Sequence, residues 1–337
     1  MNAFILVRGN KEGDLSAEYE ALGVSMFFIP LGYFNPAKWI AYYQFFRSNK
    51  FDVVCDFNAN FAGIPMLMAK LAGVKKRIAF YRQGKDHFKS TFFRRYYNRL
   101  MNRFVYRYAT HILANSQAAI DFFFSYRNGV DNRFQVIYNG VDKMQFQRLD
   151  AARQAIRKSI NIPEGAYVIG HSGRLDKAKN HSVILEVARN IIQQDPNTYL
   201  VLCGRNTEEL SQKVESLGIA NNVRLLGYRA DIPAVLQSFD LFFFPSTTEG
   251  QPNALLEAIL SGLPVVASDI APIKEIIPEA YHKFLLDASD SDGFTGLIIK
   301  IKENIIKQDT LQLKKWAEIK FDAEKNFNEF MEVICSE

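Results

Sequence analysis

The chain has 337 residues, of which 48% are hydrophobic and 23% charged, and its formal net charge is +5. This length suits two domains better than one core, and the composition is that of a globular protein. No window approaches the roughly 18 uninterrupted apolar residues that a membrane span requires, and the opening residues lack the basic and apolar regions of a signal peptide. We therefore expect a cytoplasmic location. Three well-separated cysteines, Cys55, Cys203 and Cys335, predict reduced thiols.

Short β-branched or aromatic runs alternate with helical periods along the chain, which is the pattern of parallel sheets covered by helices. The first half predicts strands at residues 4–8, 26–30, 53–57, 77–81, 111–114 and 136–138. The second half predicts strands at 167–171, 199–204, 223–227, 241–245, 265–268 and 284–286. We therefore expect an α/β protein with two doubly wound parallel-sheet domains, residues 1–141 and 142–310. A last helix within 311–337 is expected to cross back to the first domain.

The segment from residue 241 to residue 262 carries candidate ligand-binding residues. Its strand is apolar on both faces and should be central, and open parallel sheets bind ligands at the carboxyl ends of such strands. Pro252 suits the first turn of a helix, whose amide groups at 253–255 are expected to be unpaired and to attract a diphosphate. Gly250 permits close approach of the backbone to a ligand. The carboxylates of Glu249 and Glu257 are suited to accept hydrogen bonds from sugar hydroxyls.

Several stretches together resemble a known family. Glu249 and Glu257 have the Glu-x7-Glu spacing of the retaining GT-B glycosyltransferases of family 4, within FFFPSTTEGQPNALLEAILSGLPVVASD. The stretches GHSGRLDKAKNHSVILEVA, from Gly170, and LLGYRADIPAVLQSFDLFFFPS are similar to other parts of that family, and VIYNGVD at 136–142 resembles its interdomain hinge. The resemblance implies the GT-B fold, in which an acceptor-side domain and a nucleotide-sugar-binding domain, both Rossmann-like, face a cleft.

The resemblance also implies a role for each matching residue. Arg174 and Lys179 match the basic pair that neutralises the donor diphosphate, Glu257 matches the residue that holds the ribose hydroxyls, and Glu249 matches the one that contacts the donor sugar. The other implied donor-binding positions are Gly250, Asn253, Ala254, Leu255 and Leu256 at the helix start, with Gly227 and Arg229 near the base. The implied reaction moves a hexose-type sugar from a nucleoside-diphosphate sugar to a glycan or lipid-linked acceptor, with retention and without a metal or other cofactor.

Two departures from the family pattern bear on activity. The opening residues resemble the family's second strand, so its first strand and glycine-rich loop have no counterpart, and because that strand is central we expect open strand edges in the first domain. At RIAFYRQ, residues 77–83, many members carry a histidine that contacts the sugar, and Arg82 is the candidate substitute. A noncatalytic sugar-nucleotide-binding protein or partner subunit is therefore one alternative, and a sugar-nucleotide epimerase or a phosphorylase on the same fold is another.

Residues 82–112 are unusually basic and aromatic. The stretch contains one acid, Asp86, and the basic residues Arg82, Lys85, Lys89, Arg94, Arg95, Arg99, Arg103 and Arg107. Such a helix suits an anionic membrane surface, and the alternative is that Phe92, Tyr96, Leu100 and Phe104 form a buried face while the arginines are merely solvated. Together with the resemblance, this favours peripheral contact with the inner face of a membrane through residues 94–107. We expect no nucleic-acid partner, and a role in bacterial surface polysaccharide synthesis.

Overall fold

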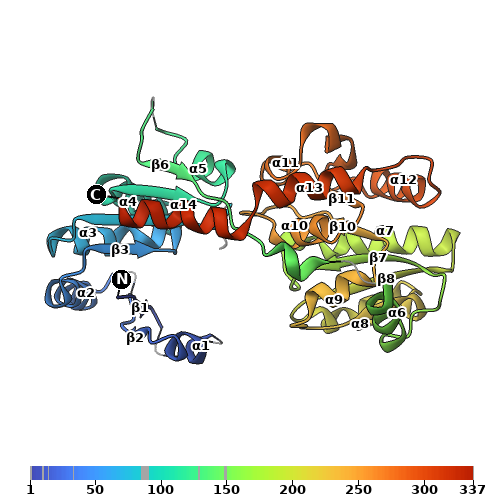
Figure 1. Cartoon of the computed structure of the whole chain (residues 1–337), viewed down its shortest axis with the longest axis horizontal. Coiled ribbons are helices and arrows are strands. Elements are labelled where there is room, and N and C mark those ends of the chain that lie inside the picture. The colour runs from blue at the N-terminus through green and yellow to red at the C-terminus, as the bar shows by residue number, and fades with distance from the viewer. Residues whose placement is uncertain are drawn as a thin grey trace. The chain divides into compact units, whose positions relative to one another are not determined.

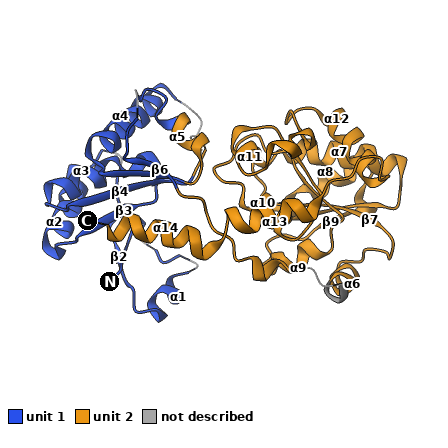
Figure 2. Cartoon of the chain, turned by 45° about the horizontal axis from the view of Figure 1, so that its top comes forward, with its two compact units in different colours: residues 1–82, 86–114, 123–136 blue, residues 83–85, 115–122, 137–337 orange. Residues whose placement is uncertain are grey.

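The computed structural model describes residues 2–9, 11–13, 15–32, 34–84, 91–127, 130–147 and 150–336, with the backbone alone for 150–152. The chain divides into two compact units, which are coloured separately in Figure 2. The first unit contains Met1–Arg82, Asp86–Ala114 and Phe123–Val136, and the second contains Gln83–Lys85, Asn115–Phe122 and Ile137–Glu337. The continuous part of the second unit thus begins within the predicted hinge.

The strands described in the first unit are all parallel and form two separate sheets (Figure 1). One sheet pairs β1 (Phe4–Val7) with β2 (Ser25–Phe28). The other has the order β3 (Val53–Asp56), β4 (Lys76–Tyr81), β5 (His111–Ala114) and β6 (Phe134–Val136). The helices are α1 (Ser16–Ala21), α2 (Pro36–Asn49), α3 (Gly63–Leu71) and α4 (Phe92–Tyr108). All six strands overlap the predicted positions.

β1 and β3 each pair on one side only among the described strands, so each has an open edge. Side chains, not a strand ladder, connect them. The rings of Phe4 and Phe51 meet edge to face with centroids 5.4 Å apart, and Arg8 forms an ion pair with Asp56. Arg8 Nη1 also donates to the carbonyl oxygen of Phe61 over 3.1 Å. β1 and β3 are thus edge strands among the described strands, and the loss of the family's first strand stays a prediction.

The second unit is built on one parallel sheet of six strands in the order β12-β11-β10-β7-β8-β9. These strands are β7 (Tyr167–Ser172), β8 (Thr198–Cys203), β9 (Val223–Leu225), β10 (Leu241–Phe244), β11 (Val265–Ser268) and β12 (Leu285–Leu286). The first strand in sequence, β7, is central and pairs with both β8 and β10. The chain therefore leaves β7 toward one edge and returns to its other side, which makes the β7/β10 boundary the topological switch point where such sheets bind ligands.

Helices cover both faces of this sheet and bury its central strand. They are α6 (Asp150–Ser159), α7 (His181–Gln194), α8 (Ser211–Ser216), α9 (Ile232–Gln237), α10 (Asn253–Leu260), α11 (Ala271–Glu275), α12 (Ser291–Lys302) and α13 (Thr310–Lys320). α14 (Ala323–Cys335) and most of α5 (Gln117–Phe123) also belong to the second unit. Phe242, Phe243 and Phe244 of β10 are fully buried, as a strand that is apolar on both faces requires.

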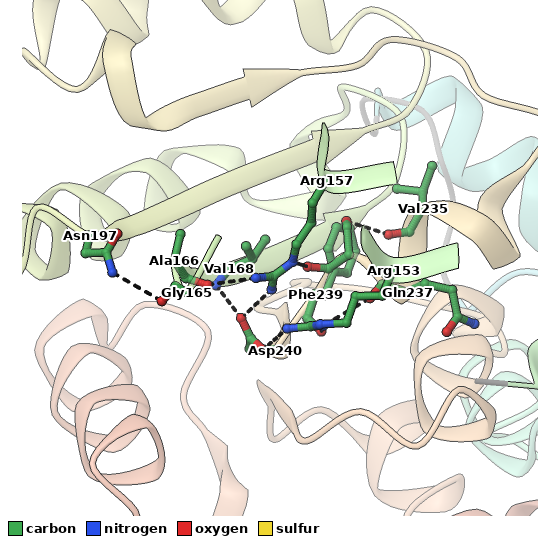
Figure 3. Close-up of polar contacts among 11 residues, drawn as sticks. Arg153, Arg157, Gly165, Ala166, Val168, Asn197, Val235, Gln237, Phe239 and Asp240 are labelled. Carbon is green, nitrogen blue, oxygen red and sulfur yellow. Dashed lines mark hydrogen bonds and ion pairs between the residues drawn. The ribbon is translucent and has the colours of Figure 1, made fainter. Parts of the chain in front are cut away.

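An ion-pair network holds α6 at the amino end of the sheet (Figure 3). Asp240, just before β10, pairs with both Arg153 and Arg157 of α6, and its Oδ2 also accepts a 2.8 Å hydrogen bond from the Val168 amide. Arg157 additionally donates to the carbonyl oxygens of Ser238 and Ala166, each over 2.9 Å. A single carboxylate thus satisfies two arginines and one strand amide that are shielded from water.

We expect Asp240→Ala to lower the free energy of unfolding by about 3 kcal/mol, because it leaves two largely buried arginines without their counterion. Urea denaturation of the purified protein measures this value. Asp269→Ala is the matched control, since Asp269 and Lys274 form a pair whose side chains are 46% and 43% exposed. The control substitution should lower the free energy of unfolding by less than about 1 kcal/mol. Equal losses in the two variants would show that the network contributes no more than a surface pair.

Candidate functional site

Two loops meet at the carboxyl ends of β7 and β10, where the topology places the switch point. The first loop begins at Gly173, whose amide donates to the Cys203 carbonyl of β8 over 2.8 Å. The second follows β10, and its Thr247 amide donates to the Ala178 carbonyl of the first loop over 2.8 Å. Most of the residues predicted to bind a ligand lie on these two loops or on the helix that follows the second.

Lys179 and Glu249 are in direct contact at this edge. Lys179 Nζ lies 2.7 Å from Glu249 Oε1, and the two side chains are only 18% and 11% exposed. The same ammonium group lies 4.7 Å from the centre of the Phe244 ring, a cation–π contact at the end of β10. Because an ammonium group has three donors, Lys179 can keep its bond to Glu249 and still bind an anion.

Arg174 is the exposed cation of the site. It follows Gly173 in the first loop, its side chain is 64% exposed, and its nearest acid is Asp176, with Nε and Oδ2 3.7 Å apart. This long, solvent-screened contact leaves the planar guanidinium available for a bidentate anion such as a phosphate. Arg174 and Lys179 therefore bring two positive charges to the loop after β7, one exposed and one largely buried.

The start of α10 differs from the expectation in one respect. The amide groups of Asn253 and Leu255 are not unpaired: they donate to the carbonyl oxygens of Gln251 and Pro252 over 2.9 and 3.1 Å. The Leu256 amide also donates to Pro252, as is usual within a helix. Of the first-turn amides among the described residues, only that of Ala254 has no acceptor. The prediction of several free amides was therefore wrong, because the chain turns tightly before the helix and the carbonyl oxygens of the two preceding residues accept these bonds.

Glu257 lies one turn inside α10 and is largely shielded from solvent. Burial alone raises the pKa of its carboxyl group from 4.5 to about 7. No hydrogen bond or ion pair to this carboxyl group is present among the described residues. A shielded acid without a partner is a candidate for binding a ligand, since hydroxyl donors from that ligand would stabilise its ionised form.

Gly227 and Arg229, the predicted base-binding positions, lie beyond β9. Gly227 is buried, has a φ of +63°, and accepts a 2.7 Å hydrogen bond at its carbonyl oxygen from the Gly204 amide. A side chain does not fit at this position, because an added Cβ would lie 1.8 Å from Glu208 Oε1. Arg229 pairs bidentately with Asp231 over 2.7 and 2.6 Å, and these bonds lower the pKa of Asp231. The Arg229 side chain is thus engaged locally, and the predicted contacts with a base stay a prediction.

Sequence reasoning missed two residues that shape the second loop. Gly84, in the short segment that belongs to the second unit, packs on the backbone of Glu249, where an added Cβ would lie 1.6 Å from the Glu249 carbonyl oxygen. Gln251 is 6% exposed and bonds to the backbone of Asn139. The GQP sequence marks a loop but does not show which distant backbone lies beside it. Arg82, exposed after β4 in the first unit, stays a predicted sugar contact.

The exposed side of α4 is a separate feature, in the first unit. Its arginine stripe consists of Arg95, Arg99, Arg103 and Arg107, all exposed and four residues apart, so they follow one face of the helix over about 18 Å. Among the described residues, no ion pair joins any of the four to a carboxylate, and α4 itself contains no acid. Lys85, Asp86 and Lys89 lie outside the described residues.

The aromatic residues of α4 do not form the face that the solvated-arginine alternative required. Phe92 and Tyr96 are 75% and 66% exposed, together with Phe93 at 85%. The buried side of the helix consists instead of Tyr97, Asn98, Met101, Asn102 and Val105. That alternative was therefore wrong for Phe92 and Tyr96, while Leu100 and Phe104 do pack against the core of the first unit. The amino-terminal turn of α4 thus presents aromatic rings to solvent beside the arginine stripe.

Two further observations concern metals and membranes. Within the described residues, no group of three or more His, Cys, Asp or Glu side chains is arranged to hold a metal ion. No helix in that part of the chain is both long and apolar enough to cross a bilayer.

Parallel sheets in each of two units, with basic residues and carboxylates at the switch point of the second, are the features expected of the GT-B class of glycosyltransferase folds. Comparison with family models agrees. The model for Glycosyltransferase Family 4 matches residues 5–144, and the model for Glycosyl transferases group 1 matches residues 152–315. The chain belongs to glycosyltransferase family 4 and has the GT-B fold.

Bacterial glycosyltransferases are among the curated relatives of this chain. An Escherichia coli enzyme named UDP-Gal:alpha-D-GlcNAc-diphosphoundecaprenol alpha-1,3-galactosyltransferase is 29% identical over 51% of this chain and 46% of its own length. The putative glycosyltransferase EpsF of Bacillus subtilis is 28% identical over 75% of this chain and 67% of its own. The match to the E. coli enzyme thus spans less than half of that relative. The crystal structure of Anabaena HepE in complex with UDP has the same fold, with a TM-score of 0.84, 21% identity and 100% coverage of both chains.

Glu257 makes the stability of the protein depend on pH. Because its pKa is about 7 in the folded state and 4.5 when exposed, the folded protein holds this proton more tightly, and the resulting stability is lost as pH rises through 7. Glu257→Gln removes this dependence. We expect the free energy of unfolding of the natural protein to fall by about 2 kcal/mol more than that of the variant when the pH is raised from 5 to 8. Urea denaturation at both pH values measures the difference, and parallel stability profiles would contradict the assignment.

Proposed function

We propose that this protein transfers a hexose-type sugar from a nucleoside-diphosphate sugar to a glycan or lipid-linked acceptor, with retention, in the synthesis of a bacterial surface polysaccharide. The observation that supports this most is that Arg174, Lys179, Glu249 and Glu257 all lie on the loops and the helix that follow β7 and β10. Lys179 and Glu249 are paired, and Glu257 has no partner for its carboxyl group among the described residues. Cations and carboxylates side by side suit a ligand that carries both phosphate groups and hydroxyl groups.

Each charged group has a role in this proposal. Arg174 and Lys179 bind the diphosphate, which carries the negative charge that grows as the bond to the sugar breaks, so they stabilise the transition state more than the ground state. Glu257 accepts hydrogen bonds from the two ribose hydroxyls. Glu249, oriented by Lys179, accepts from hydroxyls of the donor sugar. The Ala254 amide is the first-turn donor left for a phosphate oxygen.

The proposed reaction needs no protein nucleophile and no metal. The bond between C1 of the sugar and the diphosphate oxygen breaks, and the acceptor oxygen bonds to C1 on the same face. The acceptor proton passes to an oxygen of the leaving diphosphate. The two basic side chains supply the positive charge that a metal ion would otherwise provide. The name of the E. coli relative, which pairs UDP-Gal with a sugar linked to diphosphoundecaprenol, supports a lipid-linked acceptor.

Donor binding is tested by the thermal stability of the protein with UDP-, GDP- and ADP-sugars. A donor at one hundred times its Kd should stabilise the fold by about 2.7 kcal/mol. Arg174→Ala and Glu257→Ala should each abolish this shift. Lys307→Ala and Glu303→Ala are the matched controls. The adjacent residues Gln308 and Lys302 bond to Val265 and Asp195, which lie at the amino ends of β11 and β8, away from the candidate site. If no donor shifts the melting of a protein that unfolds cooperatively, the proposed function is wrong.

A noncatalytic sugar-nucleotide-binding subunit is the second candidate, and the open edges of β1 and β3 favour it. Both candidates predict donor binding, so products must separate them. The natural protein is incubated with the donor that it binds and with GlcNAc-diphosphoundecaprenol, and the lipid product is examined by mass spectrometry. Anomeric proton couplings of that product report retention. Binding without any transfer, to this acceptor or to free glycans, would support the noncatalytic subunit.

We further propose that α4 holds the protein at an anionic membrane surface, where a lipid-linked acceptor lies. The arginine stripe is suited to bind lipid phosphates, and the exposed Phe92, Phe93 and Tyr96 can enter the boundary between headgroups and acyl chains. Each basic residue near such a surface contributes about 1 kcal/mol. Four arginines with three aromatic rings therefore suffice for reversible binding without a spanning helix.

Membrane binding is tested by sedimentation with vesicles of phosphatidylglycerol and phosphatidylcholine. The triple variant Arg95→Glu, Arg99→Glu, Arg103→Glu should bind at least about 100-fold more weakly. The control triple variant Lys213→Glu, Lys307→Glu, Lys315→Glu changes exposed residues of the second unit by the same charge and should bind as the natural protein does. An equal loss of vesicle binding in the two triple variants would indicate that the net charge of the protein alone attracts it to the vesicles. Binding to nucleic acid but not to vesicles would identify the stripe as a polyanion site instead.

A further inference from the structure

Gln251 makes an unusual pair of hydrogen bonds with one distant residue. Its Oε1 accepts from the Asn139 amide over 2.6 Å, and its Nε2 donates to the Asn139 carbonyl oxygen over 3.0 Å. The side chain therefore pairs with this backbone as a neighbouring strand would. It is only 6% exposed, so water does not compete for either bond. A buried pair of this kind is costly to break, because both backbone groups would be left unsatisfied.

The contact is closed by a third residue, Asn253, the first residue of α10. The Asn139 side chain donates from Nδ2 to Asn253 Oδ1 over 3.0 Å, and the Asn253 amide donates to the Gln251 carbonyl oxygen over 2.9 Å. Asn139, Gln251 and Asn253 thus form a ring of hydrogen bonds, which we call the Asn139 clasp. Gly250 precedes the clasp in the chain, and Glu249 lies one residue further back.

Residues 138–141, which contain Asn139, are themselves fixed by contacts with other parts of the second unit. Tyr138 Oη donates to Glu275 Oε1 over 2.9 Å, and the Val141 amide donates to the Phe321 carbonyl oxygen over 2.9 Å. Gly140 packs so closely on Ala323 that an added Cβ would lie 2.3 Å from the Cα of that residue. Residues 138–141 are thus anchored to the second unit immediately after the chain leaves β6.

We propose that Gln251 is a positioning residue for the donor: through the Asn139 clasp it holds the loop 249–253 against residues 138–141, so that Glu249 and the first turn of α10 are in place before the donor binds. This inference rests on the proposed function of the site. The physical reason is that Gly250 gives the loop backbone freedom, which a ligand would otherwise have to remove on binding. Two buried side-chain bonds remove that freedom in advance.

The position of Gln251 in the chain makes the proposal specific. The residue is next to Gly250 and Pro252 but carries no charge, and both polar groups of its side-chain amide bond to the backbone of Asn139. Its effect on a ligand must therefore pass through the loop. A role limited to global stability would lower the melting temperature without changing the affinity of the folded protein for a nucleotide.

The experiment compares Gln251→Leu with Gln237→Leu. Both residues are buried glutamines of the second unit, and Gln237 Nε2 donates to the Gln147 carbonyl oxygen over 3.0 Å at the amino side of the sheet, so the control loses a comparable bond far from the site. Two quantities are measured well below the melting temperature of each protein. These are the Kd for UDP and for GDP by calorimetry, and the hydrogen exchange of backbone amides in the ligand-free protein.

We expect Gln251→Leu to speed exchange at the amides of residues 139–141 and 253–256 and to weaken nucleotide binding by about 10-fold. Gln237→Leu should change neither, even if its melting temperature falls as much. Gln251→Glu should restore part of the affinity, because it keeps the acceptor for the Asn139 amide. Unchanged exchange in Gln251→Leu would show that the clasp does not order the loop and would overturn the proposal.

The remaining outcomes separate this inference from the proposed function. If the natural protein binds UDP or GDP and Gln251→Leu binds it equally well, the positioning role is wrong while the donor site stands. If exchange rises in Gln251→Leu but the affinity does not fall, Gln251 orders the loop without helping the donor, and the proposal is again overturned. If the natural protein binds neither these nucleotides nor any donor of the panel, the proposed function fails first and the inference falls with it.

Discussion

The pairing of β7 with both β8 and β10 is the arrangement on which the candidate site depends. Because every strand of this sheet is parallel, the loops after β7 and β10 leave at the same edge, and the change in chain direction between them keeps a helix from covering the gap. Residues separated by 70 positions, Lys179 and Glu249, are thereby brought into contact. The fully buried phenylalanines of β10 hold that strand at the centre and so maintain the distance between the loops.

Some charged groups of the candidate site are neutralised within the protein and others are not. The groups that are not neutralised make the site suited to a ligand. Glu249 is neutralised by Lys179 within the protein. The Glu257 carboxyl group has no hydrogen-bond or ion-pair partner among the described residues, and burial raises its pKa to about 7. Arg174 is largely exposed, with only a long contact to Asp176. A ligand that brings phosphate groups to the arginine and hydroxyl groups to Glu257 would complete what the protein leaves unsatisfied. Family 4 membership, the proposed transfer reaction and these unpaired groups are consistent with one another.

The errors of sequence-based prediction have identifiable physical causes. Helix rules treat the first amides of α10 as free. The chain turns tightly before the helix, however, and the Gln251 and Pro252 carbonyl oxygens accept from the Asn253 and Leu255 amides. The alternative in which Phe92 and Tyr96 form a buried face of α4 was also wrong, since both side chains are exposed. The core of the first unit instead receives Tyr97 and Met101, which lie on another face of the helix. In both cases local pattern was sound and the partner surface was unknown.

The sequence by itself determined which segments become strands and helices, because β-branched and aromatic runs, turn residues and apolar periods act over a few residues. It also determined the residue types available for chemistry, including two glutamates, two basic residues and a glycine in recognisable spacing. Only the tertiary structure decided which of them meet. The bonds between Gln251 and Asn139 join residues 112 positions apart, and those between Arg157 and Asp240 join residues 83 apart. Such contacts follow from strand order, and strand order depends on the packing of the whole sheet, which no local pattern encodes.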